Sequence, residues 1–194
     1  MKNYLATVAL LAALSGTVVM AAKIQTQRDP TFDFSRLATW SWNPSGAGDV
    51  KVIMTANSKS EPVKRQYEPA LMKAVEDQIA VRGYTPASGA PPDFHVTYYL
   101  LVTQGSSAQY MGQFLPTNAQ WGIPMFAPGT SALTVYPQGT LILDVSVPAP
   151  GSMVWRGMAE AKIEIENTEE KRIARLNSVI KELVAKFPKA AKKK

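Results

Sequence analysis

The chain has 194 residues, of which 46% are hydrophobic; this composition excludes a chain disordered throughout and suffices for the core of one modest domain. It contains no cysteine, so disulfide bonds, thiolate nucleophiles, cysteine-based metal sites and lipid attachment at a cysteine are all excluded. The formal charge of +6 comes mainly from the C-terminal segment KFPKAAKKK, and no folded basic surface with interleaved aromatic residues indicates nucleic-acid binding.

Residues 1–22, MKNYLATVALLAALSGTVVMAA, have the pattern of a secretory signal peptide. Lys2 precedes an apolar run, and Val19 and Ala21 are the small residues of a cleavage site after Ala21 or Ala22. An uncleaved membrane anchor is the alternative, and the small and polar residues 15–17 argue against it. We therefore expect a soluble periplasmic protein, free or associated with the envelope, with no transmembrane span after cleavage.

The start of the mature chain predicts two short strands and a long loop. Residues 23–29 form the first candidate strand and residues 37–42 the second, with a turn at residues 33–35 between them. Residues 43–60 are rich in Asn, Pro, Gly and Ser, which is typical of an exposed loop.

A helix follows this loop, because Leu71, Val75 and Ile79 recur at helical spacing. Pro69 suits the first turn of this helix, where its missing N–H costs nothing. Gly83 supplies the left-handed residue that ends it.

Residues 94–103 alternate as a strand, with a second face (His95, Thr97, Tyr99, Leu101 and Thr103) that is less polar than a freely solvated face. The next segment, residues 104–138, is a long irregular loop containing aromatic residues and methionines among glycines and prolines. Either this loop lies over the sheet to bury Tyr99 and Leu101, or it forms a contact surface or the mouth of an apolar ligand site. The candidate partner or ligand contacts in it are Tyr110, Met111, Phe114, Trp121, Met125 and Phe126.

Residues 139–165 predict a β-hairpin closed by a loop at residues 148–152. A symmetric loop places Val147 opposite Met153 and Val145 opposite Trp155, all on the core side. The same register places Asp144 opposite Arg156 on the other face, where we expect an exposed cross-strand ion pair worth less than about 1 kcal/mol. Trp155, Asp144 and Arg156 are thus assigned structural roles, and Gly157 is expected to make room for a helix.

The last element is a helix over about residues 168–187, with Asn167 and Glu170 as a capping box and Pro188 as its stop. Residues 189–194 form a basic tail that we expect to be solvated, and attraction to anionic lipid or an envelope polymer is the alternative. The order of elements predicts a single α/β (α+β) domain over residues 23–188. Its architecture is a two-layer sandwich, a mostly antiparallel sheet with two helices packed on one face. If the second and third predicted strands are parallel, the helix between them is a right-handed crossover.

The whole mature chain resembles the bacterial envelope family known as domain of unknown function 4136. The resemblance rests on DxxFDFSRLATWSW (29–42), RGY (82–84), PDFHVTY (92–98), the pair GTLILD and VWRG, and the final KFP (186–188). It implies export, often as a lipoprotein, and an α/β fold; it implies no activity and no catalytic residues. The chain departs from the lipoprotein pattern by lacking the cysteine.

No constellation of residues predicts catalysis, a metal or a cofactor. His95 is the only histidine, it lies in the middle of a strand, and no G-x-S-x-G turn accompanies it. The glutamates of residues 160–170 are explained by strand alternation and a helix start, and no glycine-rich phosphate loop is present. The leading hypothesis is a non-catalytic domain that binds an envelope protein or polymer. A carrier of a small apolar ligand enclosed by the loop and sheet is the alternative, an enzyme is the least favoured, and the oligomeric state is undetermined.

Overall fold

The computed structural model describes residues 22–53, 57–103, 138–148, 151–163 and 168–191. The elements in chain order are β1 (Lys23–Arg28), the 3-10 helix η1 (Phe34–Arg36), β2 (Thr39–Trp42), β3 (Gly48–Ile53), α1 (Ser60–Val81), β4 (Thr85–Pro86), β5 (Phe94–Thr103), β6 (Gln138–Ser146), β7 (Met153–Lys162) and α2 (Glu169–Val184).

Seven strands in the described ranges form one open mixed sheet. The antiparallel ladders β1–β7, β7–β6 and β6–β5 make up one half of it. In the other half, β2 and β3 both run parallel to β5 along the side that β6 leaves free, and β4 pairs with β2. The parallel pairing of β2 with β5 agrees with the crossover expected for the intervening helix.

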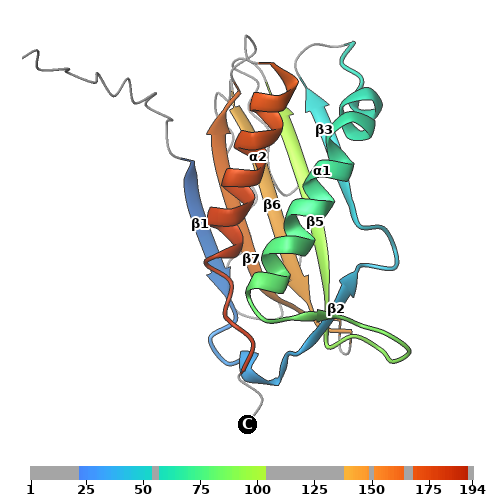
Figure 1. The fold of residues 1–194 in the computed structure, drawn as a ribbon, viewed down its shortest axis with the longest axis vertical. Coiled ribbons are helices and arrows are strands. Elements are labelled where there is room, and N and C mark those ends of the chain that lie inside the picture. Colours follow the sequence, from blue (N-terminus) through green and yellow to red (C-terminus); the bar gives the residue numbers. More distant parts are fainter. Residues whose placement is uncertain (1–21, 54–56, 104–137, 149–150, 164–167, 192–194) are drawn as a thin grey trace, which may run out of the picture.

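Both helices lie side by side on one face of the sheet (Figure 1). The core between the two layers is built from alternate strand residues, such as Val96 and Leu143, and from the inner faces of the helices. At its lower end Phe187 packs against Trp155, Tyr84 and Phe94, with ring centroids 5.2 to 5.7 Å apart. The predicted two-layer α/β sandwich is therefore confirmed.

Residues 43–60 are not one exposed loop, as the composition had suggested, because β3 lies within them. Val50 and Val52 of β3 are buried in the core, and this alternation in GDVKVI was masked by the surrounding Gly, Pro and Ser. The loop between β2 and β3 stays on β5, since the Asn43 amide donates to the Val96 carbonyl and the Tyr98 amide donates to the Ala47 carbonyl. β2 and β3 thus act as one interrupted strand beside β5.

Helix α1 begins at Ser60, so Pro69 lies inside the helix and not in its first turn. The prediction of the start was wrong because the segment before Pro69 has few apolar residues. Tertiary contacts of this segment outweigh the proline: the Ser60 hydroxyl accepts from the Val52 amide at 2.9 Å, and the Tyr98 hydroxyl donates to Glu68. The end at Gly83, which has a φ of 94°, is as predicted.

The hairpin register is confirmed at two positions, Val145 opposite Trp155 and Asp144 opposite Arg156. The pairing of Val147 with Met153 was wrong: a register shift between Val145 and Ser146 sets Met153 opposite Ser146. This β-bulge lets Val154, which is 1% exposed, join Trp155 in the core. Period-2 alternation cannot reveal such an inserted residue.

Gly157 has the predicted role. A Cβ atom at this position would overlap the Trp155 ring and lie 2.8 Å from Cδ1 of Leu183 on α2. The glycine therefore lets the indole and the helix approach the strand together.

The C-terminal end of the fold differs from the prediction in its caps. Thr168 is the N-cap of α2 and its hydroxyl accepts from the Lys171 amide, whereas Asn167 lies outside the described residues. The basic tail is not solvated from its first residue, because the Ala190 amide donates to the Arg82 carbonyl at 2.9 Å. Residues 189–191 continue along the fold beside the end of α1.

Candidate functional site

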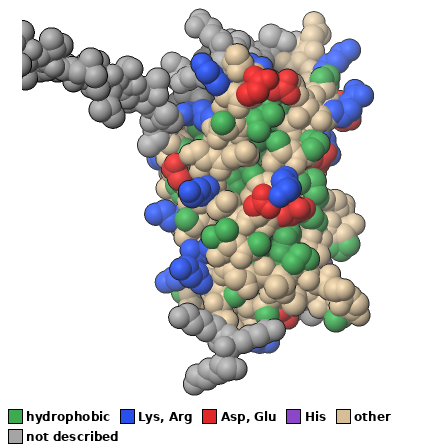
Figure 2. Space-filling view, in the orientation of Figure 1, with side chains coloured by type: hydrophobic (Ala, Val, Ile, Leu, Met, Phe, Trp, Pro, Cys, Tyr) green, Lys and Arg blue, Asp and Glu red, His purple; other side chains and the backbone are tan. Residues whose placement is uncertain are grey.

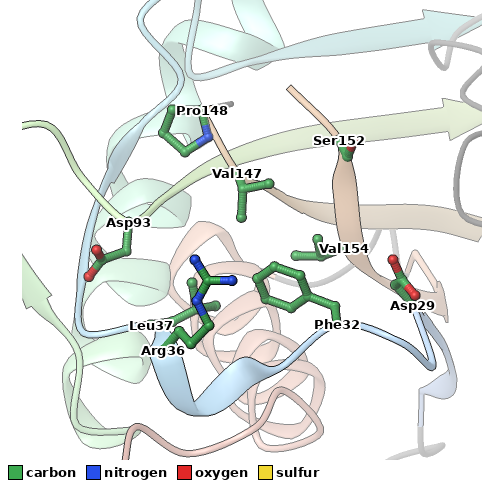
Figure 3. Close-up of a pocket in the computed structure, with 9 residues that line it drawn as sticks. All are labelled: Asp29, Phe32, Arg36, Leu37, Asp93, Val147, Pro148, Ser152 and Val154. Carbon is green, nitrogen blue, oxygen red and sulfur yellow. The ribbon is translucent and has the colours of Figure 1, made fainter. Parts of the chain in front are cut away.

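A pocket of about 400 Å³ lies at the end of the sheet where the hairpin of β6 and β7 turns, and Figure 3 shows the side chains that line it. Its walls come from the segment between β1 and β2, the residue before β5, and the residues on both sides of the turn between β6 and β7. The lining residues are Asp29, Phe32, Arg36, Leu37, Asp93, Val147, Pro148, Ser152 and Val154.

The segment between β1 and β2 owes its shape to short-range side-chain caps. Asp29 Oδ1 accepts from the amide and the hydroxyl of Thr31, at 2.8 and 2.7 Å. Asp33 Oδ1 accepts from the hydroxyl and the amide of Ser35, which lowers the pKa of Asp33 and starts η1. Because η1 is so fixed, its last residue, Arg36, is held at the pocket.

Asp93 ties the opposite wall to β2. Its Oδ2 atom accepts from the amides of Thr39 and Ala38 and from the Thr39 hydroxyl, at 2.8 to 3.0 Å. These bonds, led by the one from the Thr39 amide, lower the pKa of the Asp93 carboxyl. Asp93 therefore fixes the start of β2 beside the pocket, and backbone and hydroxyl donors stabilise its negative charge.

Arg36 is the cation of this pocket. Figure 3 shows its guanidinium beside the Phe32 ring, between Asp93 on one side and Asp29 on the other. None of the hydrogen bonds or ion pairs within the described ranges uses its side chain. A guanidinium carries five N–H donors, so Arg36 can bind an anionic group that enters between the apolar walls of Phe32, Val147 and Val154.

The ion pair of Asp144 and Arg156 is buried, which corrects the expectation of an exposed pair. The Arg156 side chain is 2% exposed, and its Nε and Nη2 atoms donate to the two carboxylate oxygens of Asp144 at 2.6 and 2.7 Å. Burial raises the pKa of Asp144, and the Arg156 guanidinium opposes that rise. The pair lies beside the row of Tyr99, Ile142 and Met158 on the same face of the sheet, and Ile142 and Met158 are buried as well.

The other predicted positions are placed as follows. Trp155 lies in the core against Phe187, and Leu101 is buried on the sheet face opposite the helices. The candidate contacts of the long loop, Tyr110, Met111, Phe114, Trp121, Met125 and Phe126, lie outside the described residues.

His95 does not belong to a catalytic triad in the described structure. Its Nδ1 atom is 2.9 Å from the Ser41 hydroxyl oxygen, the Ser41 hydroxyl donates to the Trp42 carbonyl, and no described hydrogen bond joins the ring to a carboxylate. Among the described residues, no group of three or more His, Cys, Asp or Glu side chains could hold a metal ion. No helix in the described ranges is long and apolar enough to cross a membrane.

Sequence reasoning missed Arg36. Arg36 belongs to the DFSRLATW motif. The sequence signal that could have indicated it is its position after the helix-capping Asp33 and directly before the buried Leu37. The partners of the pocket come from segments more than 50 residues apart, and their proximity could not be read from spacing along the chain.

Comparison with known families and structures gives one clear relation. The model of a family described as domain of unknown function (DUF4136) matches residues 24–189. No functionally curated protein matches the chain.

Solved structures resemble the fold only at a distance. The PelC dodecamer from Paraburkholderia phytofirmans has a TM-score of 0.43 and 6% identity, covering 88% of this chain and 99% of that one. A DUF4136 family protein from Bacteroides thetaiotaomicron has a TM-score of 0.43 and 16% identity, covering 85% and 92%. A PDZ domain protein from Parabacteroides distasonis has a TM-score of 0.48 and 12% identity, covering 89% of this chain and 36% of that one.

Proposed function

Since the chain belongs to the DUF4136 family, a domain of unknown function, we propose that it is an exported, non-catalytic binding domain of the bacterial cell envelope. Its pocket at the end of the sheet receives an anionic group of the envelope partner. Export is supported by the signal-like pattern of residues 1–22.

The observation that carries this proposal is the state of Arg36. The Arg36 guanidinium makes no described hydrogen bond or ion pair, although its positive charge helps to lower the pKa of the nearby Asp33. The two carboxylates of the pocket, Asp93 and Asp29, each have an oxygen engaged by backbone amides and hydroxyls. An anion that docks there gains charge-assisted hydrogen bonds that solvent-exposed lysines elsewhere on the chain would not provide. Binding needs no nucleophile or acid–base pair, and His95 is not among the residues that line the pocket.

The charged side chains on the helix face are the alternative positions for an anion. Figure 2 shows acidic and basic side chains interspersed over the helix face, with apolar groups between them. Several of these charges are already paired, as in Lys73 with Asp77 and Arg65 with Glu61. Such exposed pairs add little binding energy.

The test uses capped peptides as probes of the pocket. Titration of the protein, labelled in its arginine side chains, with acetyl-Ala-Glu-Glu-Ala-amide should shift the Arg36 Nε–H resonance in a saturable way, and the Gln-Gln peptide should not. Inorganic phosphate is the second anion, and it separates a preference for carboxylates from one for phosphates.

Two variants make the titration decisive. Arg36→Gln should weaken binding of the acidic peptide at least about tenfold, the loss expected for a charge-assisted contact. Arg65→Gln, an arginine on the exposed face of α1, is the matched control and should leave binding unchanged. Equal effects of the two substitutions would show that only net charge matters and would overturn the proposal.

A further inference from the structure

The two edges of the sheet differ in whether their outward-facing backbone groups are available to another strand. On the β3 edge, the Val50 amide donates to Asp49 Oδ1 at 2.8 Å and the Val52 amide donates to the Ser60 hydroxyl at 2.9 Å. The short β4 beyond β2 ends in Pro86, which has no amide hydrogen. Local side chains thus block this edge against another strand.

The β1 edge has none of these protections. Lys23–Arg28 contains no proline and no bulge in its ladder with β7. The Asp29 amide donates to the Val154 carbonyl, so odd-numbered residues turn their backbone groups toward β7. The amides and carbonyls of Ile24, Thr26 and Arg28 therefore point away from the sheet, at the free edge seen at the left of Figure 1.

We propose that β1 pairs with β1 of a second copy of this chain, antiparallel across a two-fold axis at Thr26. A two-fold axis at this residue sets Thr26 opposite its own copy and Ile24 opposite Arg28 of the second copy. These are the residues whose backbone groups point outward, so they form the hydrogen-bonded pairs of the new ladder. The result is one continuous sheet through both copies.

Charge complementarity singles out this register and this occupant. An axis at Thr26 sets Lys23 opposite Asp29 of the second copy, and symmetry repeats that pair. Both are non-hydrogen-bonded positions, where side chains on opposing strands approach closest. Shifting the axis to Gln25 or Gln27 keeps the backbone pattern but loses both ion pairs.

The Lys23 ammonium and the second carboxylate oxygen of Asp29 are available for this contact. None of the ion pairs in the described ranges includes Lys23, and the described hydrogen bonds of the Asp29 carboxylate use only Oδ1. Asp29 also lines the pocket of Arg36, so the second copy would bring a lysine to the rim of that pocket. The dimer does not depend on the proposed function of the pocket.

The test measures molar mass by sedimentation equilibrium over a dilution series of the full chain. The wild type should associate to a dimer. Lys23→Glu and Asp29→Lys should each raise the dimer dissociation constant about tenfold, since each homodimer then has two like-charged pairs. An equimolar mixture of the two variants should regain dimerisation, because the heterodimer has two opposite-charged pairs.

Thr26→Pro tests the backbone part of the proposal. It removes an outward amide and leaves the β7 ladder intact, so the dimer should dissociate while the urea midpoint of the monomer stays close to that of the wild type. A monomeric wild type, a dimer insensitive to Thr26→Pro, or a mixture that fails to regain dimerisation would each overturn the proposal. Strand addition by a peptide of another protein to a monomeric chain counts among these contrary results.

Discussion

At the scale of single residues, the buried pair of Asp144 and Arg156 changes the balance of stability in the hairpin. An exposed pair would be worth under about 1 kcal/mol, whereas removal of one partner of a buried pair leaves a charge without compensation. Trp155, on the other face of β7, lies in the core. Both strand faces of the hairpin therefore carry residues whose loss is costly.

We predict that Arg156→Ala lowers the free energy of unfolding by about 3 to 5 kcal/mol, as much as Trp155→Ala. Urea denaturation measures both. The double variant Asp144→Leu with Arg156→Met is the control, because it removes both charges together and should cost less than Arg156→Ala alone. A cost of under about 1 kcal/mol for Arg156→Ala would contradict the buried geometry.

Asp93 should make stability depend on pH. Its folded-state pKa is lowered by bonds from the Thr39 and Ala38 amides, so its contribution is complete above the ordinary pKa of an aspartate, about 3.9, and is lost as pH falls through the folded value. Asp93→Asn should cost about 1 to 2 kcal/mol at neutral pH. The difference between wild type and variant should shrink below about pH 4. A difference that stays constant down to the acid transition would show that the carboxylate charge plays no part.

At the scale of elements, α1 contains a proline that its neighbours tolerate. Pro69 is exposed on the helix and cannot donate the amide bond expected at its position. The contacts of Ser60 and Glu68 hold the first turns in place despite this defect.

Pro69→Ala should therefore raise the free energy of unfolding by about 1 to 2 kcal/mol, because the regained helical bond outweighs the added entropy of the unfolded chain. Thermal and urea unfolding measure the change. Pro86→Ala, at the sheet edge, is the control and should change stability little. A destabilised Pro69→Ala variant would mean that the proline itself shapes the packing of α1.

The C-terminal segment beyond α2 is also part of the fold. Ala190 bonds to Arg82, the Tyr84 hydroxyl donates to the Pro188 carbonyl at 3.1 Å, and Arg82 donates to the Phe187 carbonyl. Burial raises the pKa of Tyr84 to about 12, so its hydroxyl remains a donor over the physiological range.

Deletion of residues 189–194 should lower stability by about 1 kcal/mol, roughly 2 to 4 °C in melting temperature for a domain of this size. Deletion of residues 192–194 alone should have no effect, although it removes three of the same lysines. Calorimetry of the two truncations separates the docked residues from the terminal charges. Equal melting temperatures would show that Ala190 contributes nothing.

At the scale of the whole molecule, two properties govern how the domain would act: the compartment it reaches and the copies it contacts. We predict that the exported protein begins at Ala22 or Lys23, because Val19 and Ala21 satisfy the cleavage pattern. Intact mass spectrometry of protein from the envelope fraction measures this. Retention of Met1 would contradict it. Cleavage there would also leave Lys23 at the start of the mature chain, beside the open edge of β1.

The sequence by itself determined the elements whose signals are local. Alternation predicted β5 and the two strands of the hairpin, helical spacing predicted the second half of α1 and most of α2, and the order of these elements predicted two layers. The register at Val145 and Trp155 followed from matching the two faces of the hairpin. Each of these inferences depends on residues close together in the chain.

Only the tertiary structure decided the burial of Asp144 and Arg156, the presence of β3 and the pocket around Arg36. Alternation shows that two residues share a face, but whether that face is solvated depends on the strands and side chains beside it, which come from distant parts of the chain. Arg36 and Asp93 line the same pocket because β2 and β5 pair in parallel, although β3, α1 and β4 separate these two strands in the sequence. Proximity of this kind is a property of the assembled sheet, because contacts between distant segments form only when the layers pack.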